Sequence, residues 1–286
     1  MAASTAALCG ITKQYKDFTL GPVDMTVPAG SIVGLIGENG AGKTTLLKIL
    51  CGVNRADDGT VDLLGGSPAD AATRAKIGVV FEDAFFYGSF TAAQVARSLA
   101  GMYGARWNAD SFSAYLRRFG LDAGKKLKEY SRGMRLKLSL AAALARDPEL
   151  LVLDEATAGL DPVVRGELLD LFLEFIQDER HSIVMSSHIT ADLEQIADSI
   201  AYLHNGQLLF QENKDDLLQE YGVLHCGEDV LTSLPAGLVV FTRRGAYGCE
   251  SLVRERRTVQ ELLPEAVCDA ARLDDIMRFY SGRDAQ

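Results

Sequence analysis

Long apolar stretches, an excess of basic residues and paired cysteines are all missing from this sequence. Its uncharged stretches reach only 13 residues, as at 84–96, whereas a helix that crosses a bilayer needs about 20 mostly apolar residues. The first ten residues contain no basic segment before an apolar run, so we expect no secretory signal. We therefore expect a chain that stays in the cytoplasm.

The balance of charge is acidic. Lys and Arg number 29 and Asp and Glu number 39, which gives a formal net charge of −10. This charge disfavours sequence-independent attraction to nucleic acid or to an anionic lipid surface. We expect no direct nucleic acid binding, and we expect any contact with a membrane to run through a protein partner.

The cysteines do not form the pattern that a disulfide framework requires. They contain no CxxC pair, and their number is odd. We expect reduced thiols, as in cytosolic proteins. The five residues are Cys9, Cys51, Cys226, Cys249 and Cys268.

What the sequence does contain is typical of a globular protein. Of its 286 residues, 48% are hydrophobic and 24% are charged, and the mean hydropathy is +0.05. This length allows one large domain or two modest domains with a substantial buried core.

Short β-branched runs alternate with longer helical patterns over the first 222 residues, which predicts an α/β fold. The runs at 31–36, 76–81, 150–153 and 182–186 are almost continuously apolar. Strands of that composition indicate a mainly parallel core sheet that is covered on both faces. Antiparallel β elements are expected beside it, because the runs over 199–210 flank an Asn-Gly pair that is typical of a hairpin turn.

The pattern changes twice along the chain. Between about residues 87 and 147 the strand signal disappears, which predicts a helical insert within a first domain of residues 1–222. Residues 223–286 contain eight Arg and no Lys, whereas the first domain contains ten Lys and eleven Arg. A strand-like run at 237–242 and a helical pattern at 273–280 predict a small C-terminal α+β domain.

Residues 37–44 read GENGAGKT, which fits the phosphate-binding pattern GxxxxGK[ST]. The motif follows an expected strand and opens an expected helix that runs to Cys51. Glycines let the backbone N–H groups of such a loop turn toward phosphate oxygens, while Lys43 reaches the β- and γ-phosphates and Thr44 ligates Mg²⁺. The predicted ATP-binding residues of this segment are Gly37, Glu38, Asn39, Gly40, Ala41, Gly42, Lys43, Thr44 and Thr45.

Two carboxylates and a histidine follow neighbouring expected strands. Asp154 is placed for the Mg²⁺ shell, and Glu155 for polarising a water that attacks the γ-phosphate in line. His188 follows the next strand, so we expect it at the same carboxyl edge of the sheet, where ligands of open α/β folds bind. We predict Glu155, His188 and Lys43 as catalytic residues, and Asp154 with Thr44 as metal ligands.

A second anion site is indicated at the start of a later helix. Residues 130–134 read YSRGM and precede a Leu- and Ala-rich pattern at 135–146, which predicts a helix with Ser131 as its N-cap. A free helix N-terminus beside a glycine favours anions. This signal is weak by itself, because many helices begin in this way.

In this order, these elements resemble the nucleotide-binding subunit of an ATP-binding cassette (ABC) transporter over residues 5–222. The segment at 37–44 is similar to its Walker A motif, 130–134 to its signature loop, 150–155 to its Walker B motif and 158–161 to its D-loop, with His188 as the switch histidine. The resemblance implies a P-loop NTPase cassette that binds ATP and Mg²⁺.

The same resemblance implies further roles. Tyr15 occupies the place of an aromatic residue that stacks on adenine. Two subunits are expected to pair head to tail, so that the signature loop of one meets the γ-phosphate held by the other. The residues implied in that contact are Ser131, Arg132, Gly133 and Met134, with Asp161 in the D-loop.

Several positions depart from the family pattern, in which the signature reads LSGGQ. Arg132 replaces the first glycine and Met134 the glutamine of the signature. Arg132 can assist hydrolysis beside the γ-phosphate, or it can face solvent or an acidic residue, and the sequence does not decide between these. Glu82 stands where a glutamine usually follows the third core strand, and its carboxylate could still contact Mg²⁺ or water.

These features are similar to ATPase subunits of small bacterial exporters whose membrane domain is a separate chain. The resemblance implies an ATPase that pairs with a second copy or a homologous subunit, lies on the inner face of the cell membrane through a permease, and powers export. Two alternatives stay open, namely a soluble ABC ATPase that acts on nucleic acid or the ribosome, and a weakly hydrolysing regulatory half of a heterodimer. Residues 223–286 are either a dimerisation or regulatory module or a packing appendage.

Overall fold

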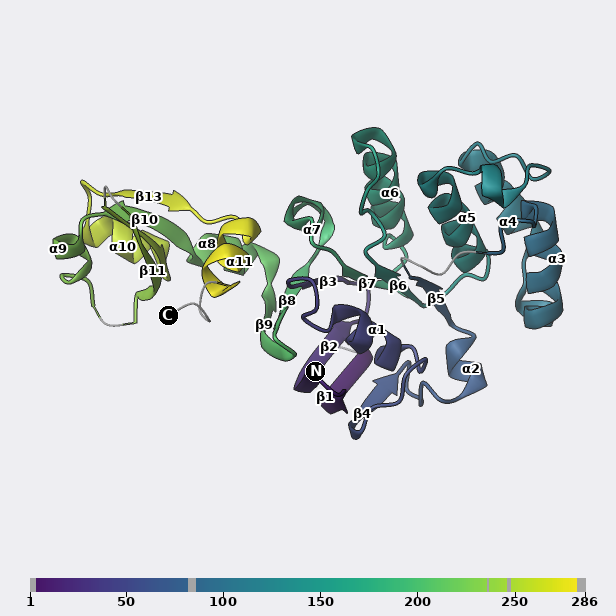
Figure 1. The fold of residues 1–286 in the computed structure, drawn as a ribbon, viewed down its shortest axis with the longest axis horizontal. Coiled ribbons are helices and arrows are strands. Elements are labelled where there is room, and N and C mark those ends of the chain that lie inside the picture. Colours follow the sequence, from purple (N-terminus) through teal and green to yellow (C-terminus); the bar gives the residue numbers. More distant parts are fainter. Residues whose placement is uncertain (1–3, 82–85, 236, 246–247, 282–286) are drawn as a thin grey trace.

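The computed structural model describes residues 4–81, 86–235, 237–245 and 248–281 (Figure 1). A six-stranded sheet of order β5-β6-β7-β3-β8-β9 lies at its centre. The first five strands in that order pair in parallel, and β9 pairs antiparallel with β8 at the edge. The strands are β3 (Ile32–Ile36), β5 (Ile77–Val80), β6 (Leu150–Asp154), β7 (Ser182–Ser186), β8 (Ser199–His204) and β9 (Gln207–Asn213).

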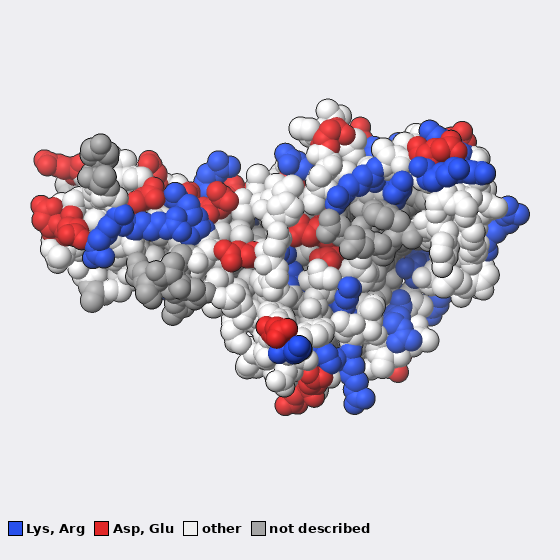
Figure 2. Space-filling model, viewed as in Figure 1, with Lys and Arg blue, Asp and Glu red and all other residues white. Residues whose placement is uncertain are grey.

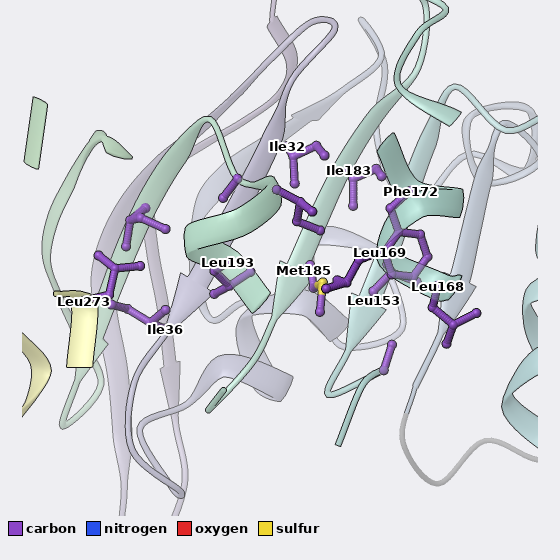
Figure 3. Close-up of a cluster of buried hydrophobic side chains, with 14 of the residues drawn as sticks. Ile32, Ile36, Leu153, Leu168, Leu169, Phe172, Ile183, Met185, Leu193 and Leu273 are labelled. Carbon is purple, nitrogen blue, oxygen red and sulfur yellow. The ribbon is translucent and has the colours of Figure 1, made fainter. Parts of the chain in front are cut away.

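Both faces of this sheet are covered, and every residue of β3, β6 and β7 is buried. On one face their side chains pack against α6 (Pro162–Phe175) and α7 (Thr190–Ile196) (Figure 3). On the other face they pack against α1 (Lys43–Leu50) and an antiparallel sheet of order β2-β1-β4. Its strands are β1 (Ser4–Gln14), β2 (Thr19–Pro28) and β4 (Asp58–Leu63).

The chain between β5 and β6 forms helices that extend to the right of Figure 1. They are α3 (Ala92–Tyr103), α4 (Ala109–Arg118) and α5 (Arg132–Leu144), with 3-10 turns at Gly104–Arg106 and Leu127–Glu129, and α2 (Ala71–Arg74) precedes β5. Thr91, Asn108 and Ser131 cap the three longer helices by accepting hydrogen bonds from backbone N–H groups three residues on. Their apolar faces form a separate buried cluster.

The chain from Gly222 onward forms a second, four-stranded antiparallel sheet of order β11-β12-β10-β13. After α8 (Lys214–Glu220) come β10 (Gly222–Cys226), α9 (Glu228–Leu231), β11 (Val239–Gly245), β12 (Gly248–Val253), α10 (Arg256–Leu262), β13 (Val267–Ala270) and α11 (Leu273–Ser281). α10 contributes Val259 to the cluster on one face of this sheet.

Helix α11 joins the two sheets. Its Leu273, Ile276 and Phe279 belong to the same buried cluster as α6 and α7. The ring of Tyr280 lies 5.7 Å from that of Tyr202 on β8 and 4.9 Å from that of Phe241 on β11, measured between centroids. The C-terminal sheet and the central sheet therefore share one core.

The expected α/β fold is confirmed, including the hairpin at 199–210. Its turn residues Asn205 and Gly206 both have positive φ, 46° and 79°. The predicted helix at 135–146 begins earlier, at Arg132, because Ser131 already caps the N–H of Met134. The strand expected at 237–242 begins later, at Val239, and extends to Gly245. No helix within the described residues combines the length and apolar character that a bilayer crossing needs.

Candidate nucleotide-binding site

The loop at 37–44 connects β3 to α1 at the carboxyl edge of the central sheet. Its glycines are required where neighbours approach closely. A β-carbon on Gly37 would lie 2.2 Å from the backbone oxygen of Leu203, and one on Gly42 would lie 2.9 Å from the Phe18 ring. Gly42 has a φ of 106° and precedes the first residue of α1, so the loop turns directly into the helix N-terminus. This is the geometry that favours a bound phosphate.

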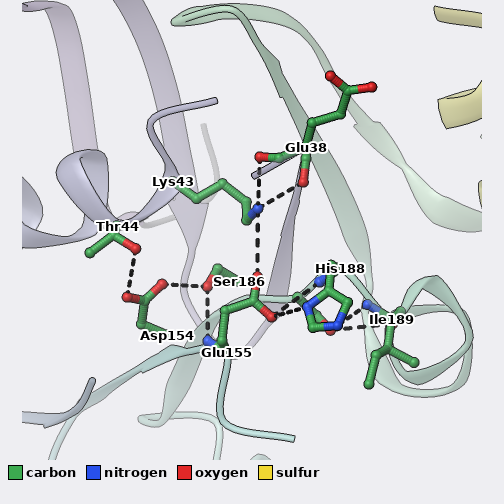
Figure 4. Close-up of polar contacts among 10 residues, drawn as sticks. Glu38, Lys43, Thr44, Asp154, Glu155, Ser186, His188 and Ile189 are labelled. Carbon is green, nitrogen blue, oxygen red and sulfur yellow. Dashed lines mark hydrogen bonds and ion pairs between the residues drawn. The ribbon is translucent and has the colours of Figure 1, made fainter. Parts of the chain in front are cut away.

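Lys43 is buried at the centre of this loop, with 6% of its surface exposed. Its Nζ donates hydrogen bonds to the backbone oxygens of Gly37 (2.7 Å) and Glu38 (3.2 Å). The Oε1 atom of Glu155 lies 3.5 Å from the same Nζ (Figure 4). The ammonium group is thus held next to a carboxylate, at the place where phosphate oxygens can replace the backbone carbonyls as its partners.

Thr44 and Asp154 meet across the site. The Thr44 hydroxyl donates a hydrogen bond of 2.8 Å to Oδ2 of Asp154, and the buried Ser186 hydroxyl donates one of 2.6 Å to Oδ1 (Figure 4). A hydroxyl and a carboxylate oxygen side by side fit Mg²⁺, which prefers oxygen ligands and is usually held by few carboxylates together with substrate phosphates. Glu82, the third predicted metal ligand, lies outside the described residues.

Glu155 and His188 form a hydrogen-bonded pair. Oε2 of Glu155 accepts a hydrogen bond of 2.6 Å from Nδ1 of His188 and one of 3.3 Å from its backbone N–H. The Glu155 side chain is 11% exposed, whereas that of His188 is 53% exposed. Glu155 has a left-handed φ of 51°, and its own N–H donates to Ser186 Oγ at 3.0 Å. This conformation directs its carboxylate away from that of Asp154 and toward Lys43.

Lys43, Thr44 and Glu155 border a cleft of about 450 Å³, whereas Asp154, Ser186 and His188 are not among its lining residues. Of the predicted ATP-binding residues, Gly37 and Ala41 do not line it, and Ala41 instead accepts a hydrogen bond from Gly206 through its backbone oxygen. The lining residues are Tyr15, Phe18, Glu38, Asn39, Gly40, Gly42, Lys43, Thr44, Thr45, Lys48, Asn54 and Glu155.

Tyr15 is one wall of the cleft and is 41% exposed. Its ring lies 6.4 Å from that of Phe18, and its hydroxyl accepts a hydrogen bond of 3.4 Å from Asn54. Sequence reasoning missed Phe18, Lys48 and Asn54 as lining residues. Lys48 was recognisable, since it lies one helical turn after Thr44, whereas Phe18 lies in the turn between β1 and β2 and Asn54 in the loop after α1.

The signature loop does not line this cleft. Ser131 Oγ accepts a hydrogen bond from the N–H of Met134 at 3.2 Å, and a β-carbon on Gly133 would lie 3.5 Å from the Leu160 side chain. Arg132 lies against the D-loop, where a β-carbon on Gly159 would be 3.6 Å from its Cζ. Asp161 caps α6 by accepting a hydrogen bond of 3.0 Å from Val164.

Sequence comparisons with known proteins identify the family of this chain. A sequence profile described as ABC transporter matches residues 20–158. The bacitracin transport ATP-binding protein BcrA of Enterococcus faecalis is 35% identical over 212 residues, which cover 72% of this chain and 68% of that protein. The chain belongs to the ABC transporter ATP-binding family. This membership fits the resemblance of residues 37–44 and 150–155 to the Walker A and Walker B motifs of the family.

Two further comparisons show how much of this chain is similar to known proteins. An ABC transporter ATP-binding protein of Synechocystis is 38% identical over 206 residues, or 70% of this chain, and the match spans only 58% of that relative. A solved ATP-binding subunit of an ABC transporter superposes with a TM-score of 0.68 at 28% identity, over 75% of this chain and 92% of that one. The fold is therefore that of an ABC ATPase cassette.

Proposed function

We propose that this chain is the ATP-hydrolysing subunit of an exporter, in which two ATP-binding subunits close around ATP and drive a separate membrane protein. The observation that carries the proposal is that Glu155, which borders the nucleotide cleft together with Lys43, contacts both the Lys43 ammonium group and the His188 ring. The name of one relative, a bacitracin transport ATP-binding protein, supports transport as the process that hydrolysis powers.

The side chains divide the chemistry of hydrolysis among them. Lys43 and the backbone N–H groups of the loop bind the β- and γ-phosphates. Thr44 and Asp154 would hold Mg²⁺, which neutralises charge on the phosphate oxygens when bound. Glu155 takes a proton from the water that attacks the γ-phosphorus in line, and the bond to the ADP oxygen breaks. His188 keeps the Glu155 carboxylate aimed at that water.

A second subunit would complete the site. The cleft is lined by one side of the cassette only, while Ser131, Gly133 and the N-terminus of α5 lie elsewhere in the same chain. Residues 87–147 contain 11 Lys and Arg against four Asp and Glu in a chain whose net charge is −10, and basic side chains gather over these helices in Figure 2. A positive surface around a helix N-terminus suits the γ-phosphate of ATP held by a partner.

The proposed subunit also needs a membrane partner. It would place the chain at the inner face of the cell membrane, bound to a permease made as a separate protein. The name of the Enterococcus relative supports a transporter, and the residues around Glu82 are our candidates for relaying closure to the permease.

The variant Glu155→Gln tests the function directly. We expect it to retain ATP while steady-state turnover falls at least about a hundredfold, because an amide cannot accept the proton. The matched control is Glu179→Gln, which changes an exposed carboxylate outside the site. Radiolabelled ATP measures both binding and turnover, and unchanged turnover in Glu155→Gln would remove Glu155 as the base.

The same variant identifies the partner. It is tagged in its native cells, extracted in mild detergent with ATP and Mg²⁺, and the co-purifying proteins are identified by mass spectrometry. Recovery of a multi-helix membrane protein supports the exporter. Recovery of ribosomal or DNA-bound proteins contradicts it and favours a soluble ABC ATPase.

A further inference from the structure

Three cysteines lie on one face of the C-terminal sheet. Cys226 on β10 is directly opposite Cys249 on β12, and Cys268 on β13 is directly opposite Leu224. Directly opposite residues share a face, and so do residues two apart along a strand. Cys226 and Cys268 accordingly contribute to the same apolar cluster beneath α10. Within the described parts of the sheets, 226 and 249 are the one pair of cysteines in direct register.

The separation of this pair is close to what a disulfide needs. Directly opposite residues of antiparallel strands have β-carbons about 4.5–5.5 Å apart, and a disulfide joins β-carbons about 3.5–4.5 Å apart. An approach of roughly 1 Å is therefore sufficient. Cys268 lacks this option, because β10 separates it from Cys249 and its offset from Cys226 is diagonal.

The local backbone can provide that approach. Cys226 is the last residue of β10, and Cys249 is the second residue of β12, so the pair lies at the end of the ladder, where strands fray. Gly227 follows one cysteine and Gly248 precedes the other. Glycine has the greatest backbone freedom of all residues, and one on each strand lets both adjust.

The pair is also accessible. Cys226 and Cys249 both border an open cleft of about 530 Å³ at the end of the sheet, together with Arg243, Arg244 and Glu250. Cys226 is partly exposed, whereas Cys249 is 6% exposed. Burial raises the pKa of the Cys226 thiol, and Cys249 and Asp229 raise it further. A protonated thiol reacts slowly, so the raised pKa slows the attack of Cys226 on a disulfide at neutral pH.

We infer that Cys226 and Cys249 form a redox-active dithiol, which closes to a disulfide at the outer end of the C-terminal sheet. The oxidant is a small disulfide such as oxidised glutathione. The Cys226 thiolate attacks one of its sulfurs and expels one glutathione thiolate, and the Cys249 thiolate then attacks Cys226 Sγ and expels the second. The two protons from the protein thiols leave on the two glutathione molecules.

The test uses the full chain in glutathione buffers of increasing oxidised fraction, quenched with an alkylating agent and mapped by mass spectrometry. We expect one cross-linked peptide that joins Cys226 to Cys249, with an intact mass lower by two hydrogens. We expect excess reduced glutathione to open the bridge, and a higher pH to speed its formation, because more of the raised-pKa thiol is then ionised.

Serine variants provide the matched comparison. Cys226→Ser and Cys249→Ser are each expected to abolish the bridge, while Cys268→Ser and Cys9→Ser are expected to keep it. The inference is overturned if no bridge forms at any glutathione ratio, or if Cys268 replaces either partner in the wild-type peptide map. The peptide map of the wild-type chain shows by itself which cysteines are bridged. A serine variant that fails to fold therefore does not affect the conclusion.

Discussion

At the scale of single residues, Ser186 connects the carboxylate of Asp154 to the backbone of Glu155. It is fully buried, its hydroxyl donates to Asp154 and accepts from the N–H of Glu155, and it therefore sets the positions of both. A side chain of this kind cannot be recognised from a motif, because a serine that ends a strand has many possible partners. The strand pairing of Asp154 with Ser186 creates the contact.

We predict that Ser186→Ala impairs both stability and turnover. Loss of the hydroxyl leaves a buried carboxylate oxygen without its donor, which should lower the free energy of unfolding by about 1–3 kcal/mol. ATP turnover should fall at least about tenfold, because Asp154 and Glu155 lose their alignment. Urea denaturation and an ATPase assay measure the two effects.

The neighbouring serine is the control for this experiment. Ser187 is equally buried, but its hydroxyl contacts the backbone of Ile189 and not a carboxylate of the site. Ser187→Ala should lower the free energy of unfolding, but its rate of ATP turnover should stay higher than that of Ser186→Ala. Equal turnover in the two variants would contradict the connecting role of Ser186.

At the scale of elements, the local sequence predicted helices and strands best where several sequence signals agreed. Around residues 37–44 the strand, the loop and the helix were all predicted, because the glycine-rich turn and the apolar pattern of the following helix indicate the same structure. The cap predicted at Ser131 is confirmed, and α5 begins directly after it, at Arg132 and not at Arg135.

Contacts between distant elements were not predictable in the same way. Phe18 borders the cleft from the turn between β1 and β2, where its backbone oxygen accepts from Tyr15, and Asn54 borders it from the loop after α1, where its N–H donates to the backbone oxygen of Lys48. No local pattern marks these positions. The role of α11 also emerged only in three dimensions. Its apolar pattern predicts a helix, but the neighbours of that face belong to strands of both sheets.

We predict that Ile276→Ala in α11 destabilises the whole chain. Ile276 is fully buried in the core that the two sheets share, and its truncation should lower the free energy of unfolding by about 2–5 kcal/mol. Fluorescence of Trp107, among the distant helices, should shift to lower urea together with the circular dichroism signal. Asp274→Ala, on the exposed side of α11, should change stability by a few tenths of a kcal/mol.

A different result would separate the two sheets. If Trp107 fluorescence in Ile276→Ala keeps its wild-type midpoint while circular dichroism shows an earlier transition, the C-terminal sheet unfolds alone. The division at residues 222 and 223, which stays a prediction, would then describe two units of independent stability.

At the scale of the whole molecule, the open cleft and the separate signature loop predict assembly that depends on ATP. Glu155→Gln should be monomeric without nucleotide and dimeric with ATP and Mg²⁺. Adding Gly133→Asp should prevent the dimer, because a carboxylate at the N-terminus of α5 would repel the partner's γ-phosphate while still favouring the helix. Light scattering at fixed protein concentration measures the mass.

A glycine on another helix controls for added charge. Gly101 in α3 has no atom near the position of its β-carbon, so Gly101→Asp is sterically tolerated. In the Glu155→Gln background it should leave the dimer intact. If both aspartate variants dimerise with ATP, the signature loop does not contact the nucleotide across the interface.

The left-handed backbone of Glu155 lowers folding stability but places a carboxylate at the cleft. A residue with a β-carbon at a φ of 51° costs about 1–2 kcal/mol relative to glycine, which would be unstrained there. The chain carries that cost at the position where a carboxylate must point toward the cleft. The cassette thus has a lower free energy of unfolding than it could have, because this backbone conformation holds one functional group in place. In sequences selected only for stability, we expect this strained residue to be replaced first.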